Sequence, residues 1–166
     1  QGFDQWINTD PDFSIFGIVK FFNLILNCNP NIIDVLFVPE RCVIHCTKVG
    51  QIVRDNRHLF LSKKAYHSFK GYAYSQSKKI QTKNPTGKRC ELVEKFGYDT
   101  KFAYHIVRLM NECRQILESG DLNLESDSQQ YIAIREGAWR LEYLLQWFEN
   151  QIVDLEHTYN VSTLRY

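Results

Sequence analysis

The sequence predicts an α+β fold in which a small sheet remnant precedes a mainly helical C-terminal region. Polar and apolar residues alternate from Asp12 to Phe16, which is the pattern of a half-buried strand. From Ile18 onward, apolar residues recur at helical spacing in several long segments. The chain has 166 residues, which suits one domain or two small ones.

The first predicted elements are a strand and a helix in direct succession. The strand over 12–16 leads into a helix with apolar residues at 18, 21, 22, 25 and 26. That helix ends before Pro30, because proline disfavours helical geometry in the preceding residue. Residues 32–38 are predicted to form a turn of helix followed by a buried strand. Residues 45–57 are predicted to form a short helix.

Longer helices are predicted in the remainder of the chain. One begins near Ser62, a suitable N-terminal capping residue. The loop over 82–87 follows, because it contains Asn-Pro-Thr-Gly. Further helices are expected from Asp99 to the stop at Gly120 and over 138–157, with irregular structure over 121–130.

The composition indicates an intracellular protein. Five cysteines, odd in number and irregularly spaced, favour reduced thiols and a cytoplasmic location. The longest apolar run, Phe13 to Leu26, is interrupted by polar residues. It is also shorter than the ~20 apolar residues that a membrane-spanning helix requires. We therefore expect a soluble protein that does not contact membranes.

A net charge of +1 conceals a strong charge asymmetry along the chain. Ten Lys or Arg residues and one acidic residue lie between Arg54 and Arg89. After Glu118, eight acidic residues face three arginines. This segregation predicts an anion-binding surface in the middle of the chain. A lysine-rich helix face that only contacts solvent is the alternative interpretation.

Four polar residues of the predicted helix after Asp99 share one face. They lie at i, i+4, i+7 and i+11 and are Lys101, His105, Arg108 and Glu112. An arginine here suits two phosphate oxygens at once, and a lysine acts as a point charge. Lys88 and Arg89 follow the Pro-Gly loop and are positioned to close over the same anion. These residues predict a triphosphate site, with a plain solvent-facing surface as the alternative.

Three runs of sequence carry a resemblance to a known family. They extend from Lys20 to Phe37, from Phe69 to Gln76 and from Gly97 to Leu109. Together they resemble the nucleotidyltransferases of the DNA polymerase β superfamily found in bacteria and large phages, some of which are linked to RNA repair. The resemblance covers about residues 2–120.

Membership implies metal-dependent transfer of a nucleoside monophosphate from a nucleoside triphosphate to a nucleic-acid end or another acceptor. Two Mg²⁺ (or Mn²⁺) ions would activate the acceptor hydroxyl and stabilise the leaving pyrophosphate. Residues 1–45 would be a partial nucleotidyltransferase core, and residues 46–166 would bind nucleotide and acceptor. The implied triphosphate contacts are Lys101, His105 and Arg108, with Lys88 beside them. The expected RNA or DNA acceptor contacts are Lys63, Lys64, Lys70, Tyr72 and Lys78.

The sequence departs from the family at the metal site. The family carries its first two metal-binding carboxylates in an Asp-x-Asp strand after a Gly-Ser helix start, and neither pattern occurs here. Asp10 and Asp12 have the spacing, but Pro11 is unsuited to a central strand. Asp12 is therefore expected to be the third carboxylate, both catalytic residue and metal ligand. Either an upstream segment holds the other two carboxylates, or the protein has lost them and only binds.

Two further functions remain as alternatives. The basic middle, with Tyr66, Tyr72 and Tyr74, is suited to a non-catalytic nucleic-acid-binding module, which would bind in a salt-sensitive manner without triphosphate or Mg²⁺. The acidic last helix is suited to protein interaction or oligomer formation. Exposure of Trp139 and Trp147 would favour that interpretation.

Overall fold

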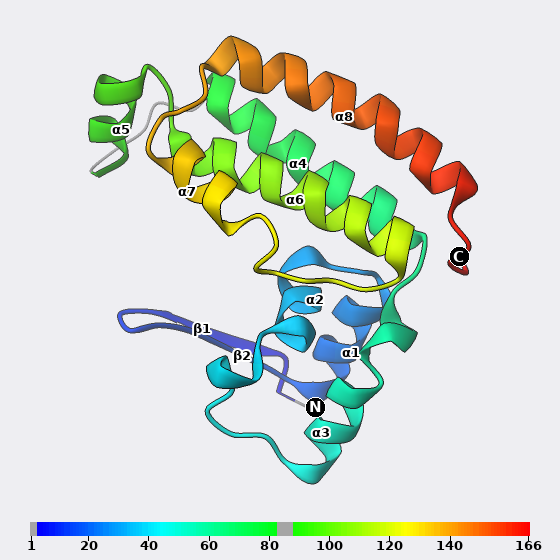
Figure 1. The fold of residues 1–166 in the computed structure, drawn as a ribbon. Coiled ribbons are helices and arrows are strands. Elements are labelled where there is room, and N and C mark those ends of the chain that lie inside the picture. The colour runs from blue at the N-terminus through cyan, green and yellow to red at the C-terminus, as the bar shows by residue number, and fades with distance from the viewer. Residues whose placement is uncertain (1–2, 83–87) are drawn as a thin grey trace.

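The computed structural model of the protein describes residues 3–82 and 88–166. Most of the predicted loop over 82–87, and the side chain of Lys88, lie outside the described part of the chain. A two-stranded sheet is followed by helices, so the predicted α+β class is confirmed (Figure 1). The helices are α1 (Ile18–Leu26), α2 (Pro30–Phe37), α3 (Lys48–Asp55), α4 (Lys64–Thr82), α5 (Lys88–Phe96), α6 (Thr100–Ser119), α7 (Ser128–Arg135) and α8 (Leu141–Val161).

The sheet is a hairpin that extends away from the helices (Figure 1). Strands β1 (Gln5–Thr9) and β2 (Asp12–Phe16) are antiparallel, with Thr9 paired to Asp12. β2 then leads through Gly17 into α1, which confirms the predicted succession of strand and helix. β1 was not predicted, because its five residues lack a clear alternation.

The predicted buried strand within residues 32–38 is wrong, because this segment is part of α2. Asn29 has extended backbone geometry, and Pro30 occupies the first turn, where a helix needs no N–H donor. The helix then buries the apolar residues of the segment at 32, 33, 36 and 37. A short apolar run fits a buried strand and a buried helix equally well, so periodicity could not distinguish the two for this segment.

α6 is the central helix of the C-terminal region and packs against α4, α7 and α8 (Figure 1). Its start and end are as predicted. The Asp99 side chain accepts a hydrogen bond from the Lys101 backbone N–H at 2.9 Å, and Gly120 ends the helix in left-handed geometry (φ 66°). The predicted apolar stripe is buried: Phe102, Ile106, Leu109, Met110, Cys113 and Leu117.

Two short helices, α5 and α7, were not predicted, and α8 begins a few residues later than expected. The segments that form α5 and α7 have eight or nine residues and weak apolar periodicity.

Trp139 and Trp147 are half-buried and contact each other edge to face, with ring centroids 5.4 Å apart. They therefore do not form the exposed tryptophan surface that would favour an interaction module. No helix in the described ranges is long and apolar enough to cross a membrane.

Candidate functional site

A polar pocket of about 250 Å³ lies where α2, α4, α5 and α6 meet. Tyr72, predicted as an acceptor contact, lines it, and its hydroxyl accepts a hydrogen bond from Asn31 Nδ2 at 3.4 Å. Phe102 is buried below it. The pocket therefore combines basic and aromatic side chains of α4, α5 and α6 with an amide side chain of α2. Its lining residues are Asn31, Tyr72, Gln76, Lys79, Arg89, Phe102 and His105.

The buried carboxylate of Asp99 joins the start of α6 to α5. One oxygen caps α6, while Oδ2 lies 3.3 Å from Arg89 Nη1. The Arg89 guanidinium also lies over the Phe102 ring, 4.5 Å from its centroid. The ion pair and the ring contact together hold Arg89 at the polar pocket.

His105 lies among cations from three helices. Burial, and after it the positive charges of Arg108, Lys101, Arg135 and Arg89 in that order, together lower the pKa of His105 to about 4. The imidazole is therefore neutral at pH 7. We call these four residues around His105 the cation cluster. The cluster brings the predicted Lys101, His105 and Arg108 together with two arginines from α5 and α7.

Within the cation cluster, Lys101 and Arg108 differ in their surroundings. Lys101 is exposed on the first turn of α6, and its ammonium has no partner among the described residues. Arg108 is largely buried, and its Nη1 lies 2.5 Å from Asp34 Oδ2 and 3.4 Å from Glu112 Oε1. Lys101 is therefore open to a ligand, whereas Arg108 is held by two carboxylates.

Arg108, Asp34 and Glu112 form a buried charge network with more acid than base. Burial and, after it, the nearby Asp34 carboxylate raise the pKa of Glu112 to about 8, against the lowering effect of Arg108. Burial also raises the pKa of Asp34, against the effect of Arg108. Several of their buried atoms have no hydrogen-bond partner among the described residues: Asp34 Oδ1, Arg108 Nε and Glu112 Oε2. A proton on Glu112 at neutral pH balances the network's charge.

Most of the predicted acceptor contacts lie away from the polar pocket. Lys63 lies 5.3 Å from the Tyr159 ring centroid, and Lys70 Nζ donates to the Tyr66 hydroxyl at 2.6 Å. The Tyr66 and Tyr159 rings stack at 4.7 Å, so α4 and α8 meet in a tyrosine cluster: Lys63, Tyr66, His67, Lys70 and Tyr159. At about 100° per residue, Lys70 and Tyr72 point to nearly opposite sides of α4.

The other two predicted acceptor lysines lie elsewhere on α4. Lys64 Nζ donates to the Leu26 carbonyl of α1 at 3.4 Å. Lys78 lies toward the other end of the helix and is exposed. The single basic region of the sequence is therefore divided over several faces of the molecule.

Asp12, the predicted metal ligand, is exposed beside the turn of the hairpin. Figure 1 shows that this turn lies at the end of the hairpin farthest from the helices. Among residues 3–82 and 88–166, no group of three or more His, Cys, Asp or Glu side chains is arranged to hold a metal ion. The described residues therefore do not fit a two-metal site, and the role of Asp12 stays a prediction.

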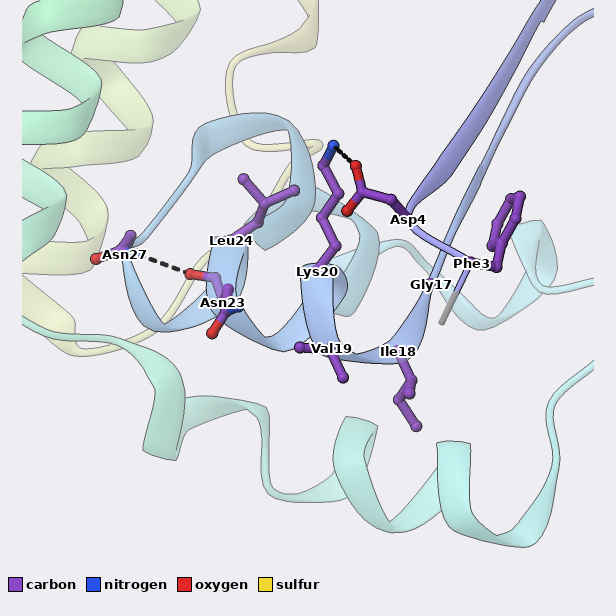
Figure 2. Close-up of a pocket in the computed structure, with 9 residues that line it drawn as sticks. All are labelled: Phe3, Asp4, Gly17, Ile18, Val19, Lys20, Asn23, Leu24 and Asn27. Carbon is purple, nitrogen blue, oxygen red and sulfur yellow. Dashed lines mark hydrogen bonds and ion pairs between the residues drawn. The ribbon is translucent and has the colours of Figure 1, made fainter. Parts of the chain in front are cut away.

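A larger cavity of about 590 Å³ lies between the hairpin and α1 (Figure 2). Lys20 Nζ contacts Asp4 Oδ2 at 2.8 Å across it, and the Gly17 N–H donates to the Asp4 carbonyl at 2.8 Å. Its other lining residues are mainly apolar or amide side chains. An ion-paired lysine and aspartate supply no set of groups for phosphate binding, so we favour the polar pocket as the site.

A family model described as RlaP, the RNA repair pathway DNA polymerase beta family, matches residues 2–151. The chain belongs to the RlaP family. This is a family of DNA polymerase beta-type nucleotidyltransferases, so the resemblance carried by the three sequence runs is confirmed. Comparisons with curated proteins and with solved structures gave no match.

Several residues that line the polar pocket of this RlaP-family protein were not predicted from the sequence. Asn31, Gln76 and Lys79 were not assigned to a site, and Phe102 was assigned only to the core. The sequence could have assigned Lys79 to the pocket, since it lies at i+7 from Tyr72 on the same helix face. No sequence pattern indicates Asn31, because only the packing of α2 brings it to α4. Arg135 was also missed, since α7 itself was not predicted.

Proposed function

We propose that this protein acts in metal-dependent transfer of a nucleoside monophosphate from a nucleoside triphosphate to a nucleic-acid end. The cation cluster is the part of the chain that binds the triphosphate. The observation that carries this proposal is the convergence of four positive side chains on one neutral histidine beside an open pocket. Family membership supports the reaction class, because the family is one of nucleotidyltransferases.

Each member of the site has a role that follows from its surroundings. Lys101 and Lys79 are exposed, so they offer point charges to phosphate oxygens. Arg89 is held by Asp99 and presents the rest of its guanidinium to the polar pocket. Neutral His105 donates a ring N–H to an oxygen without adding charge. Lys88 remains a proposed triphosphate contact from the sequence.

Arg108 is assigned a different part in the same site. Its contacts to Asp34 and Glu112 leave it little freedom to grip a phosphate, but its charge still acts on His105. We therefore propose that Arg108 supplies positive potential and joins α2 to α6. This modifies the direct phosphate contact expected from the sequence.

The reaction class requires a divalent metal, Mg²⁺ or Mn²⁺, to stabilise charge on the phosphates. Asp12 is the residue that we propose as a ligand. One exposed carboxylate makes no two-metal site, and residues 3–82 and 88–166 contain no group of three or more His, Cys, Asp or Glu side chains arranged to hold a metal ion. The roles proposed for the described residues therefore concern binding of the nucleotide and of the acceptor.

For the acceptor, we propose binding of RNA or DNA phosphates by Lys63, Lys64, Lys70 and Lys78. The tyrosine cluster supports this proposal, because cations beside aromatic rings are typical of single-strand binding surfaces. The same cluster also favours the second candidate function, a nucleic-acid-binding module without catalysis.

The proposal is tested by incubating the full chain with each α-labelled nucleoside triphosphate, Mg²⁺ or Mn²⁺ and a mixed pool of RNA and DNA. The test variant is Lys79→Ala/Lys101→Ala, and the control Lys48→Ala/Lys95→Ala removes the same charge from exposed lysines outside the site. We expect label transfer by wild type and control, and at least a tenfold loss in the test variant, since each lost phosphate contact costs about 1.5–3 kcal/mol.

Two results would contradict the proposal. Equal transfer by test variant and control would show that Lys79 and Lys101 do not bind the triphosphate. No transfer with any nucleotide, together with salt-sensitive binding of nucleic acid, would leave the non-catalytic module as the function.

A further inference from the structure

A third cavity lies against α6 and shares no lining residue with the polar pocket. It has a volume of about 350 Å³ and is formed by side chains of α6 and α7 with the residue that follows α7. It is lined by Tyr104, Ser128, Tyr131, Ile132, Arg135 and Glu136. We call it the aromatic cavity. None of the roles proposed above uses its two tyrosines.

The walls of the aromatic cavity are held in place by contacts on their outer sides. The Tyr104 and Tyr131 rings meet edge to face, 5.7 Å apart at 68°. The Tyr131 hydroxyl lies 3.4 Å from both Asn111 Nδ2 and Asp127 Oδ2. Ring positions fixed in this way form a preorganised surface, which lowers the entropy cost of stacking a planar ligand.

The aromatic cavity adjoins the cation cluster. Tyr104 precedes His105 on α6, and their ring centroids are 4.8 Å apart. Arg135 belongs to both regions: its guanidinium lies 5.8 Å from the Tyr104 ring centroid, and its charge acts on His105. Lys101 is exposed on the first turn of the same helix. One molecule with an aromatic ring and several phosphates therefore has complementary surfaces on both sides of this turn.

We propose that the aromatic cavity holds the base of the nucleoside triphosphate, while its phosphates lie at the cation cluster. This inference rests on the proposed function and adds a base-binding site to it. Every base offers a π face to Tyr104 or Tyr131, and Arg135 at the rim stacks on planar rings. The Glu136 carboxylate and the Ser128 hydroxyl accept hydrogen bonds, so bases with an exocyclic amino group bind more tightly than uracil.

The test uses a variant that fills the aromatic cavity and leaves the cations in place. Ile132 lines the cavity and is 50% exposed, so Ile132→Trp occupies the space without disturbing the core. The matched control is Val153→Trp, which adds a tryptophan at a 68% exposed position of α8. Binding of ATP, GTP, CTP, UTP and inorganic tripolyphosphate is measured by calorimetry for wild type and both variants.

We expect Ile132→Trp to weaken binding of ATP, GTP and CTP by about tenfold or more, which is the effect of losing one stacked base. Tripolyphosphate binding stays unchanged in this variant, and Val153→Trp matches wild type with every probe. Unchanged nucleotide binding in Ile132→Trp would overturn the base site and leave the proposed function intact. Failure of wild type to bind either tripolyphosphate or any nucleotide would overturn the proposed function, and the base site with it.

Discussion

At the scale of single residues, the buried network of Asp34, Arg108 and Glu112 determines how α2 meets α6. The two carboxylates share one guanidinium, and burial raises the pKa of Glu112 to about 8. The folded protein therefore holds a proton on Glu112 that the unfolded chain releases above its ordinary pKa of 4.5. This contribution to stability is present at acidic pH and is lost as the pH rises through 8.

Removing Arg108 leaves two buried carboxyl groups without their cation. We expect Arg108→Ala to lower the free energy of unfolding by about 3–5 kcal/mol, as is found when one partner of a buried ion pair is removed. Urea unfolding at pH 7 measures the change. The control is Arg41→Ala, which removes an exposed ion pair with Glu125 and is expected to change stability little. A small effect of both variants would show that Arg108 does not hold α2 to α6.

The residue scale is also where sequence reasoning was least complete. The helical spacing predicted that Lys101, His105 and Arg108 share a face of α6, and Lys101 and Arg108 both belong to the cation cluster around His105. Asp34 lies 74 positions before Arg108. No local sequence pattern indicates such a pair. The prediction that Arg108 contacts phosphate directly was therefore made without knowledge of its carboxylate partner.

At the scale of elements, Gly17 is the joint between the hairpin and α1. A Cβ atom added there would lie 1.8 Å from the Phe3 carbonyl oxygen, so the backbones approach too closely for any other residue. The backbone at Gly17 has ordinary extended geometry (φ −62°). The requirement for glycine is therefore one of space and not of backbone conformation.

This joint is tested by a pair of glycine substitutions. Gly17→Ala is expected to lower the free energy of unfolding by about 1–3 kcal/mol, because the hairpin must shift to admit the methyl group. Gly71→Ala, within α4, has no atom within 4 Å of the added carbon and is expected to raise stability by about 0.5–1 kcal/mol. Thermal unfolding measures both changes. Unchanged or raised stability of Gly17→Ala would contradict the close packing at Gly17.

Element prediction succeeded where apolar periodicity was long. α4, α6 and α8 each span about twenty residues and were predicted with small errors at their ends. α2 was partly predicted as a strand. α5 and α7, with nine and eight residues, were missed because their apolar periodicity is weak, whereas the equally short α1 has a clear apolar periodicity and was predicted. Helices this short depend on tertiary packing more than on their own sequence.

At the scale of the whole molecule, charge counting found the basic region but not its arrangement. The described lysines of this region, from Lys63 to Lys79, lie on different sides of α4 or just before it, so the tyrosine cluster and the polar pocket are separate surfaces. Counting also missed Arg135, which comes from the acidic C-terminal part of the chain and completes the cation cluster. The fold therefore assembles the proposed triphosphate site from segments of opposite overall charge.

The most direct test of the cation cluster is the pKa of His105, measured by NMR with and without inorganic tripolyphosphate and assigned with a His105→Gln variant. We expect a pKa of about 4 in the free protein. Bound anions screen the surrounding positive charges and raise this pKa, so tripolyphosphate affinity increases as the pH falls through the window between the two values. A His105 pKa near 6.5 that tripolyphosphate does not change would contradict a triphosphate site at the cation cluster.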